Sequence, residues 1–273
     1  MPLDPTQLPL PNSKYKPQKI SVYRTVGNTE LKAHIFFPKD LSQANRRPAF
    51  VFFHPGGWTM GDPAWGYDIC HRYASCAMVA ISFQYRLSSI GGFTPVEAVS
   101  DAMCAIRWTR RHADELGSDP ERLVASGVSS GGHLAACAAM LTGSDDLDDS
   151  LIFNPVPNAL VLQCPCVNPV IDSHFVELLQ GMGKAENYSP THHVRAGLPP
   201  MCLIHGTADE IVSYDSVKQF AAKMQEAGNR CELHTLEGTD HFFVRKSDQD
   251  KAMALIDNFL LDLGYIERAP TKT

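Results

Sequence analysis

The segment that most constrains the fold is Gly127–Gly131, with the sequence Gly-Val-Ser-Ser-Gly, because it lies between two stretches of different character. Residues 123–126 have the apolar composition of a buried strand, and residues 132–141 are small, helix-forming residues. Only small neighbours let a chain reverse so sharply from strand to helix, and the two glycines supply that room. The pattern predicts a strained turn that exposes the Ser129 hydroxyl, with the Ser130 amide pointing the same way. A plain Gly/Ser turn is the alternative.

Elsewhere the chain alternates short apolar runs with amphipathic ones, which is the pattern of a parallel sheet covered by helices. The expected strands are 19–25, 31–38, 48–54, 78–83, 123–126, 159–164, 201–205 and 231–236, with the first two as an antiparallel pair. The expected helices are 97–116, 132–141, 213–227 and 251–263. Because the 273 residues contain no internal repeat or linker, we predict one α/β domain, 1–273, with a mostly parallel eight-stranded sheet.

The overall composition excludes several classes of partner. The chain is 44% hydrophobic and 20% charged, as ordinary globular proteins are, and its formal net charge is −6. Basic residues occur only in short pairs, which argues against nucleic acid or an anionic membrane as a partner. No apolar stretch reaches the roughly 18 residues of a membrane span. A small molecule is therefore the expected partner, and a homodimer is left open.

The N-terminus and the cysteines bear on the compartment and on metals. The first residues form neither a basic nor an apolar region of a signal peptide, and the eight cysteines are scattered through apolar segments. Both features favour a reducing, cytoplasmic compartment, although a processed secreted form stays open. The pair in Cys164-Pro165-Cys166 is too closely spaced for a usual zinc site, and no second pair accompanies it. We therefore expect no metal.

A serine hydroxyl becomes a nucleophile at neutral pH when a histidine accepts its proton and a carboxylate orients that histidine. Asp209 follows the predicted strand 201–205, and His241 follows the predicted strand 231–236. Carboxyl ends of parallel strands meet at one edge of a sheet. We therefore predict that Ser129, Asp209 and His241 converge as a catalytic triad.

Several residues compete for these roles. The predicted acid could instead cap the helix that follows it, and its neighbour Glu210 is a rival carboxylate. His205 ends a strand before a glycine, which is typical of a structural residue. His133 lies one helical turn beyond the serine and is expected to face the core. His192 and His193 lie in a long connection, where they could touch a substrate.

A second glycine pair follows the third predicted strand, in the segment 54–58, His-Pro-Gly-Gly-Trp. Two glycines let the backbone curl so that consecutive N–H groups converge on one point. Pro55 has no N–H and cannot donate. We predict that Gly56, Gly57 and Ser130 form an oxyanion hole, with an ordinary Gly-Gly turn as the alternative.

Three segments depart from the alternation of strands and helices. Residues 1–18 are rich in proline and are expected to form an arm on the surface. The acidic residues 144–150 lack the glycine and the terminal glutamate of an EF-hand loop, so a solvated loop is favoured over a calcium site. Residues 168–199 are too long for a turn, and we predict a short helical lid over the site. The candidate walls of this lid are Phe175, Leu178, Leu179 and Met182.

Together these motifs resemble the α/β-hydrolase superfamily, in the branch of small esterases related to hormone-sensitive lipase and to bacterial feruloyl and acetyl xylan esterases. The chain departs from the family at Pro55, where the family has glycine, and at Ser130, where alanine is usual. Neither change removes an expected N–H donor. The resemblance extends over residues 20–263 and includes the motifs at 54–58, 85–87, 118–122, 129–135, 189–190, 199–200, 205–209 and 238–243.

The resemblance implies ester hydrolysis without a metal or organic cofactor. It points to a serine carboxylic ester hydrolase that cleaves short-chain acyl esters, with acetyl groups on carbohydrate among the candidates. The residues expected to contact the substrate are Trp58, His133, Phe175 and Phe242. Two alternatives stay open: an amide hydrolase of the arylformamidase or acyl-aminoacyl peptidase type, and a receptor that binds a ligand on the same fold without catalysis.

Overall fold

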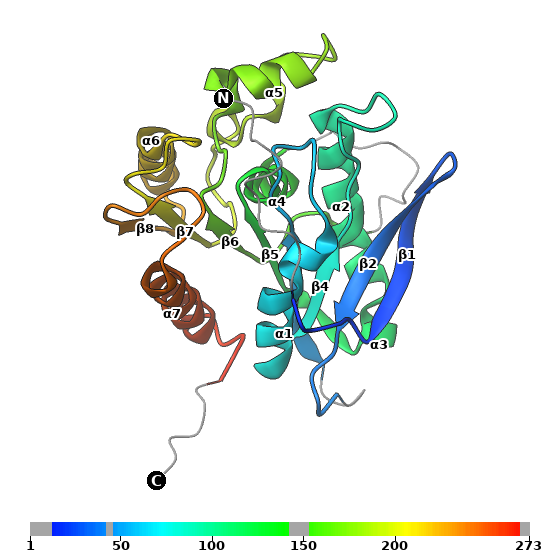
Figure 1. Cartoon of the computed structure of the whole chain (residues 1–273). Helices are drawn as coiled ribbons and strands as arrows, with labels where there is room; N and C mark the ends of the chain where they lie inside the picture. The colour runs from blue at the N-terminus through cyan, green and yellow to red at the C-terminus, as the bar shows by residue number, and fades with distance from the viewer. Residues whose placement is uncertain (1–12, 42–45, 142–152, 268–273) are drawn as a thin grey trace.

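A sheet of eight strands runs through the molecule in the order β1-β2-β4-β3-β5-β6-β7-β8 (Figure 1). The computed structural model describes residues 13–41, 46–141 and 153–267. The strands are β1 Lys19–Val26, β2 Thr29–Phe36, β3 Arg47–Phe53, β4 Val79–Phe83, β5 Ser118–Val128, β6 Ala159–Gln163, β7 Met201–Gly206 and β8 Cys231–Leu236. Strand β1 pairs antiparallel with β2, and β2 with β4, whereas the six strands from β4 to β8 are parallel. The predicted sheet is confirmed.

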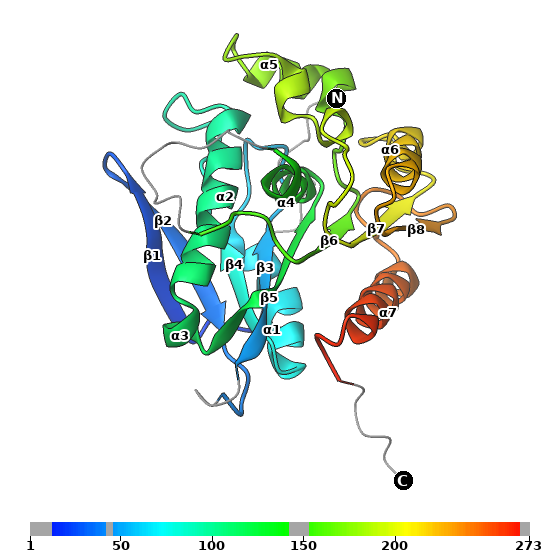
Figure 2. The same ribbon diagram turned by 180° about the vertical axis from the view of Figure 1, so that it is seen from behind.

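Seven α-helices surround this sheet in the described part of the chain. Helices α1 and α7 pack on one face, and α2, α4 and α6 pack on the other (Figures 1 and 2). Along β3, Ala49, Val51 and Phe53 face the second group, and Phe50 and Phe52 face the first. Such a strand must be apolar throughout, because both of its faces are buried. The helices are α1 Tyr67–Ser75, α2 Pro95–Arg111, α3 Ala113–Leu116, α4 Ser130–Met140, α5 Ser173–Leu178, α6 Tyr214–Glu226 and α7 Lys246–Asp262.

The helices α2, α3 and α7 differ most from the expected boundaries. The predicted helix 97–116 is two helices, because the chain leaves helical geometry at His112 between α2 and α3. Helix α2 also begins earlier, at Pro95, where Thr94 and Glu97 form a capping box. Helix α7 begins five residues before the expected start. The sequence pattern missed its first turn because that turn is polar and has no apolar periodicity. Helix α1 was not among the expected helices.

The segment 168–199 folds into short helices, as its length suggested. It contains α5 and the 3-10 helices Pro169–Ile171, Ala185–Tyr188 and Pro190–His192. This segment lies at one end of the molecule, beyond α4 and α6 (Figures 1 and 2). Its role as a lid stays a prediction.

The predicted N-terminal arm is described only from residue 13, and the acidic segment 144–150 lies outside the described residues. The described part of the arm lies against α1. There the Ser13 hydroxyl donates to Asp68 over 2.9 Å, and the ring of Tyr15 stacks on His71 with centroids 3.5 Å apart.

All eight cysteines are free thiols, and seven of them are buried. The predicted compartment stays a prediction. Within the described ranges, no helix combines the length and the apolar character that crossing a bilayer requires.

Candidate active site

The turn between β5 and α4 has the strained geometry that the sequence predicts. Ser129 has φ 55° and ψ −120°, in a region that residues with a side chain rarely adopt. A Cβ atom on Gly127 would lie 2.3 Å from the backbone of Gly131, and one on Gly131 would lie 2.1 Å from the carbonyl oxygen of Phe53. Glycine is therefore required on both sides of the serine, because the turn, α4 and β3 pack in direct backbone contact.

The predicted acid and base are in contact. The Nδ1 atom of His241 lies 2.7 Å from Oδ2 of Asp209. An ionised carboxylate only accepts hydrogen bonds, so Nδ1 carries the proton and Nε2 is left as the acceptor. The imidazole is 5% exposed, and His241 and Ser129 line the same cavity. The structure thus joins the predicted base to the predicted acid and places the predicted nucleophile and base on one cavity.

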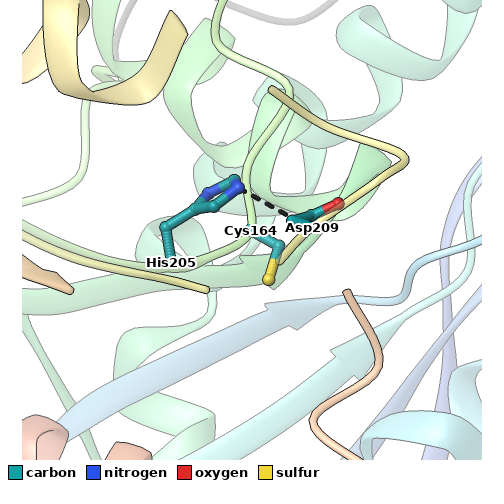
Figure 3. A group of neighbouring side chains, drawn as sticks. All are labelled: Cys164, His205 and Asp209. Carbon is teal, nitrogen blue, oxygen red and sulfur yellow. Dashed lines mark ion pairs between the residues drawn. The ribbon is translucent and has the colours of Figure 1, made fainter. Parts of the chain in front are cut away.

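The carboxylate of Asp209 is saturated with hydrogen bonds. Its Oδ1 accepts from the backbone N–H groups of Ile211 and Val212 over 2.9 and 2.8 Å. Its Oδ2 lies 3.1 Å from Nε2 of His205 (Figure 3) and also contacts His241. Burial by itself would raise the pKa of this carboxyl, but the donated hydrogen bonds outweigh burial and hold the pKa well below its usual value. The rival carboxylate one residue later is exposed to solvent.

Two side chains beside the acid were not predicted to belong to the site. His205 is fully buried, and its Nε2 also lies 2.9 Å from the carbonyl oxygen of Val212. Because this carbonyl and the Asp209 carboxylate are both acceptors, Nε2 carries the proton and donates it to both. Cys164 also lies beside the acid (Figure 3), and its Sγ is 3.5 Å from the carbonyl oxygen of His241. The spacing of His205, four residues before the acid at the end of β7, was the available signal.

Cys164, His205 and Asp209 place potential metal-ligating atoms within 4.8 Å of one another. Both carboxylate oxygens are already engaged by protein donors, and burial raises the pKa of the Cys164 thiol well above its usual value. A metal would need the thiolate and would have to displace the bonds that hold the acid. The donor set therefore fits a support for the acid better than a metal site.

The glycine loop after β3 adopts three successive left-handed conformations. Gly56, Gly57 and Trp58 have φ angles of 133°, 58° and 61°. A Cβ atom on Gly56 would lie 2.0 Å from the carbonyl oxygen of Met60, so only glycine fits there. Among the described residues, the N–H groups of Gly56 and Gly57 donate to no protein acceptor, and the N–H of Ser130 is in the first turn of α4, which has no intrahelical acceptor. The three N–H groups are thus available to a ligand.

His54 contacts Pro55, the residue that precedes this loop. Its Nδ1 lies 2.8 Å from the carbonyl oxygen of Pro55, its ring stacks on Tyr85 at 4.2 Å, and its own carbonyl accepts from the Tyr85 hydroxyl over 2.9 Å. A Cβ atom on Gly61 would lie 2.2 Å from this imidazole, so the chain closes tightly around it. Burial lowers the pKa of His54 to about 4, and the residue is neutral at physiological pH.

Two cavities meet at Ser129. The larger one has a volume of about 640 Å³ and includes Gly56 and His241, and its lining contains the aromatic residues Tyr15, Phe52, Trp65, Phe242 and Phe243. The smaller one has a volume of about 190 Å³ and includes Gly57. It is lined by Trp58, Cys166, Asp172, His174, Glu177 and Val212. The serine therefore separates a large apolar space from a small, more polar one.

The four predicted substrate contacts divide into two pairs. Trp58 lines the small cavity and Phe242 the large one, so these two remain candidates. His133 faces the core, as its place one turn beyond the serine indicates, and the prediction that it contacts the substrate is wrong. The residue is fully buried, its Nδ1 accepts from Trp58 Nε1 over 3.2 Å, and its Nε2 lies 2.7 Å from the carbonyl oxygen of Tyr188. The prediction for Phe175 is also wrong, because this ring is fully buried against Trp58 and His133.

The other candidate walls of the lid also lie elsewhere. Leu178 and Leu179 pack on the core, and Met182 is 55% exposed. Helix α5 instead presents His174 and Glu177, three residues apart on the same face, to the small cavity. The side that faces the site is thus the polar side of this amphipathic segment, and its apolar side holds the segment to the core.

Comparison with known proteins identifies the family to which this fold belongs. Residues 50–245 match the family described as alpha/beta hydrolase fold. Among curated proteins, the chain is 27% identical over 229 residues to a probable isoprenylcysteine alpha-carbonyl methylesterase of Arabidopsis thaliana, covering 76% of this chain and 47% of that protein. It is 26% identical to carboxylesterase NlhH of Mycobacterium tuberculosis, covering 81% of this chain and 74% of that protein. The chain spans about half the length of the first curated relatives that it matches.

Solved structures extend the similarity to nearly the whole chain. The apo form of Thermogutta terrifontis esterase 2 superposes with a TM-score of 0.89 at 39% identity, covering 96% of this chain and 100% of that chain. Propionate-bound and butyrate-bound forms of the same esterase each superpose with a TM-score of 0.86 and cover 92% of this chain and 96% of that chain. The relatives are carboxylesterases and lipases, and the chain belongs to the α/β-hydrolase fold family.

Proposed function

We propose that the protein is a serine ester hydrolase. The observation that carries the proposal is that Ser129, in its strained turn, opens on the same cavity as His241, whose Nδ1 is bound to Asp209. With Nδ1 held by the carboxylate, Nε2 of His241 is the nitrogen left to accept the serine proton. The buried carboxylate then stabilises the imidazolium that forms.

In this proposal the reaction proceeds through an acyl-enzyme. The Ser129 oxygen attacks the ester carbon, and the N–H groups of Gly56, Gly57 and Ser130 stabilise the negative oxygen of the tetrahedral intermediate. His241 then returns its proton to the leaving alcohol as the C–O bond breaks. Water repeats the sequence, with the same histidine as base, and releases the acid.

The position of His241 assigns the two cavities in this scheme. The group that protonates the leaving alcohol must lie next to it, and His241 lines the larger cavity. The alcohol therefore occupies the space of about 640 Å³, and the acyl group occupies the space of about 190 Å³. The smaller volume lies below the roughly 300–1,000 Å³ of sites for drug-sized ligands, which favours a short acyl chain. The propionate and butyrate forms of the Thermogutta esterase support the same preference.

The lining of the larger cavity favours an alcohol with an apolar face. Its aromatic rings, among them Tyr15, Trp65 and Phe242, can stack on an aryl ring or on the apolar face of a sugar. Charged groups such as Asp68 and Lys246 stand among the lining residues and could hydrogen-bond to hydroxyls. Acetylated carbohydrate therefore remains a candidate substrate.

The decisive experiment compares the wild-type protein with Ser129→Ala on p-nitrophenyl acetate, butyrate and octanoate. We expect wild-type turnover that falls steeply beyond the butyrate ester, and loss of at least about 10³-fold in kcat in the variant. A fluorophosphonate should label the wild type but not the variant. The matched control is Ser75→Ala, because this serine is exposed on α1 and lines neither cavity.

Two outcomes would contradict the proposal. Near-normal turnover by Ser129→Ala would exclude the serine as nucleophile. Absence of both turnover and labelling in the wild type would instead favour a receptor that binds a ligand on this fold. Parallel assays with N-formylkynurenine and an acylated peptide would show whether amides are better substrates than esters.

A further inference from the structure

We propose that His174, on helix α5, is a positioning residue of the oxyanion loop, Gly56–Trp58. The proposal rests on the proposed function, because it concerns how that loop holds its N–H donors. The Nε2 atom of His174 lies 3.2 Å from the carbonyl oxygen of Gly57. A carbonyl only accepts, so Nε2 donates this hydrogen bond, although the two residues are 117 positions apart in the chain.

The loop needs such a contact because its backbone is intrinsically free. Gly56 and Gly57 have no side chains to pack, and glycine populates left-handed and right-handed conformations about equally. The peptide plane between them is held from within the loop, since the Gly56 carbonyl accepts from the N–H groups of Thr59 and Met60 over 3.1 Å each. The next plane, between Gly57 and Trp58, is held by His174. Both planes that flank the Cα atom of Gly57 are then fixed.

Helix α5, which carries His174, also packs against the same loop through a second residue. Its N-cap residue, Asp172, accepts from the N–H groups of His174 and Phe175 over 3.0 and 3.3 Å. Phe175 packs edge-on against Trp58, with ring centroids 4.9 Å apart. Two neighbouring residues of α5 thus contact two neighbouring residues of the loop, one through a hydrogen bond and one through an aromatic contact. The segment predicted as a lid is, in this proposal, also the support of the oxyanion hole.

The test uses a pair of substitutions that differ in reach. Glutamine has the same number of bonds from Cα to its side-chain nitrogen as histidine has to Nε2, whereas the nitrogen of asparagine corresponds to Nδ1. His174→Gln can therefore restore the donor to Gly57, and His174→Asn cannot. Val176→Asn on the same helix is the matched control, because Val176 is 46% exposed and lines neither cavity.

We expect His174→Asn to lower kcat for p-nitrophenyl acetate by about 10- to 100-fold with KM nearly unchanged, because small displacements of catalytic groups have effects of this size. His174→Gln should recover most of that loss. Affinity for a trifluoromethyl ketone, whose hemiketal oxygen occupies the oxyanion hole, should fall in parallel with kcat/KM. The melting temperature of both variants and the activity of Val176→Asn should stay close to the wild-type values.

Three results would overturn the proposal. Equal activity of the Gln and Asn variants would exclude the hydrogen bond as the cause. A loss confined to KM would make His174 a substrate contact in the small cavity. Unchanged ketone affinity in His174→Asn would separate the residue from the oxyanion hole. If the wild-type protein itself neither turns over esters nor binds the ketone, the proposed function fails first, and this proposal fails with it.

Discussion

The two halves of the candidate site are held in place by different means. On the acid-base side, Asp209 is bound by His205, Ile211 and Val212, all within four residues of it in the chain. On the oxyanion side, the loop Gly56–Trp58 is bound by His174 and His133, which lie 117 and 75 residues away from their partners. A local turn thus orients the acid, whereas the oxyanion loop depends on side chains from distant elements in addition to its own backbone bonds.

The halves also differ in charge. The acid-base side depends on an ionised carboxylate whose pKa is held well below its usual value. The oxyanion side depends on two buried neutral histidines, because burial lowers the pKa of both His54 and His133 to about 4. The acid-base side therefore requires that Asp209 stay ionised, whereas the oxyanion side requires that His54 and His133 stay neutral.

The largest expected effect follows from removing the charge on the acid-base side. Asp209→Asn should lower kcat by about 10³- to 10⁴-fold, because the amide no longer selects the correct tautomer of His241 or stabilises the imidazolium. Steady-state kinetics on a short-chain ester measure the loss. Glu210→Gln is the matched control and should change kcat by less than about twofold, since that side chain is exposed. A loss below tenfold in Asp209→Asn would mean that another carboxylate serves His241.

A smaller effect is expected from the backbone of the oxyanion side. Gly56→Ala should lower kcat/KM by about 10²-fold, because the new Cβ would lie 2.0 Å from the carbonyl oxygen of Met60 and the loop must shift. Gly92→Ala is the control: this glycine also has a positive φ, 73°, but a Cβ there meets nothing within 4 Å. It should lose only about 1 kcal/mol of stability and no activity. Equal activity of the two variants would contradict the assigned role of the loop.

The smallest expected effect is a difference between the two halves in how pH changes the free energy of unfolding. The unfolded chain protonates His54 and His133 below about pH 6.5, whereas the folded protein resists protonation down to about pH 4. Both residues therefore destabilise the fold as the pH falls from 6.5 to 4, each by at most about 1.4 kcal/mol per pH unit. Asp209 does not contribute in this window, because a carboxyl with a lowered pKa loses its stabilising effect only below the ordinary value of 3.8.

Urea unfolding at several values between pH 7.5 and 4.5 measures this slope. His133→Gln should have a shallower slope than the wild type, because one of the two protons is then no longer taken up on unfolding. An unchanged slope in this variant would place the acid sensitivity in other groups.

Much of the fold and half of the site could be predicted from residue types alone. The strands could be predicted because strands buried on both faces must be apolar throughout. The strained turn at Ser129 could be predicted because glycines flank it, and the contacts of Gly127 and Gly131 admit no side chain. Asp209 and His241 were found because each follows a strand that ends at the same edge of the sheet. Helix α1 could also have been predicted, since Tyr67, Cys70 and Tyr73 are buried at helical spacing.

The residues that contact the substrate or support the site could not be predicted, because their roles depend on which neighbour each side of a helix faces. Phe175 was expected at the substrate, and His133 either there or in the core, yet both are fully buried against Trp58. His174 was not predicted to belong to the site, and Cys164 was considered only as a possible metal ligand, although His174 contacts the oxyanion loop and Cys164 lies beside the acid. A spacing pattern describes an element's own faces, but it does not tell which partner each face meets.

The sequence by itself thus determined the parallel sheet, the strained serine turn, and the identity of an acid and a base at strand ends. These follow from local sterics and from the rule that strand ends meet at one edge. Only the tertiary structure decided that two cavities of unequal size meet at Ser129 and that α5 contacts the loop at Gly57. Such contacts join residues more than a hundred positions apart, and their geometry depends on how whole elements pack rather than on any local pattern.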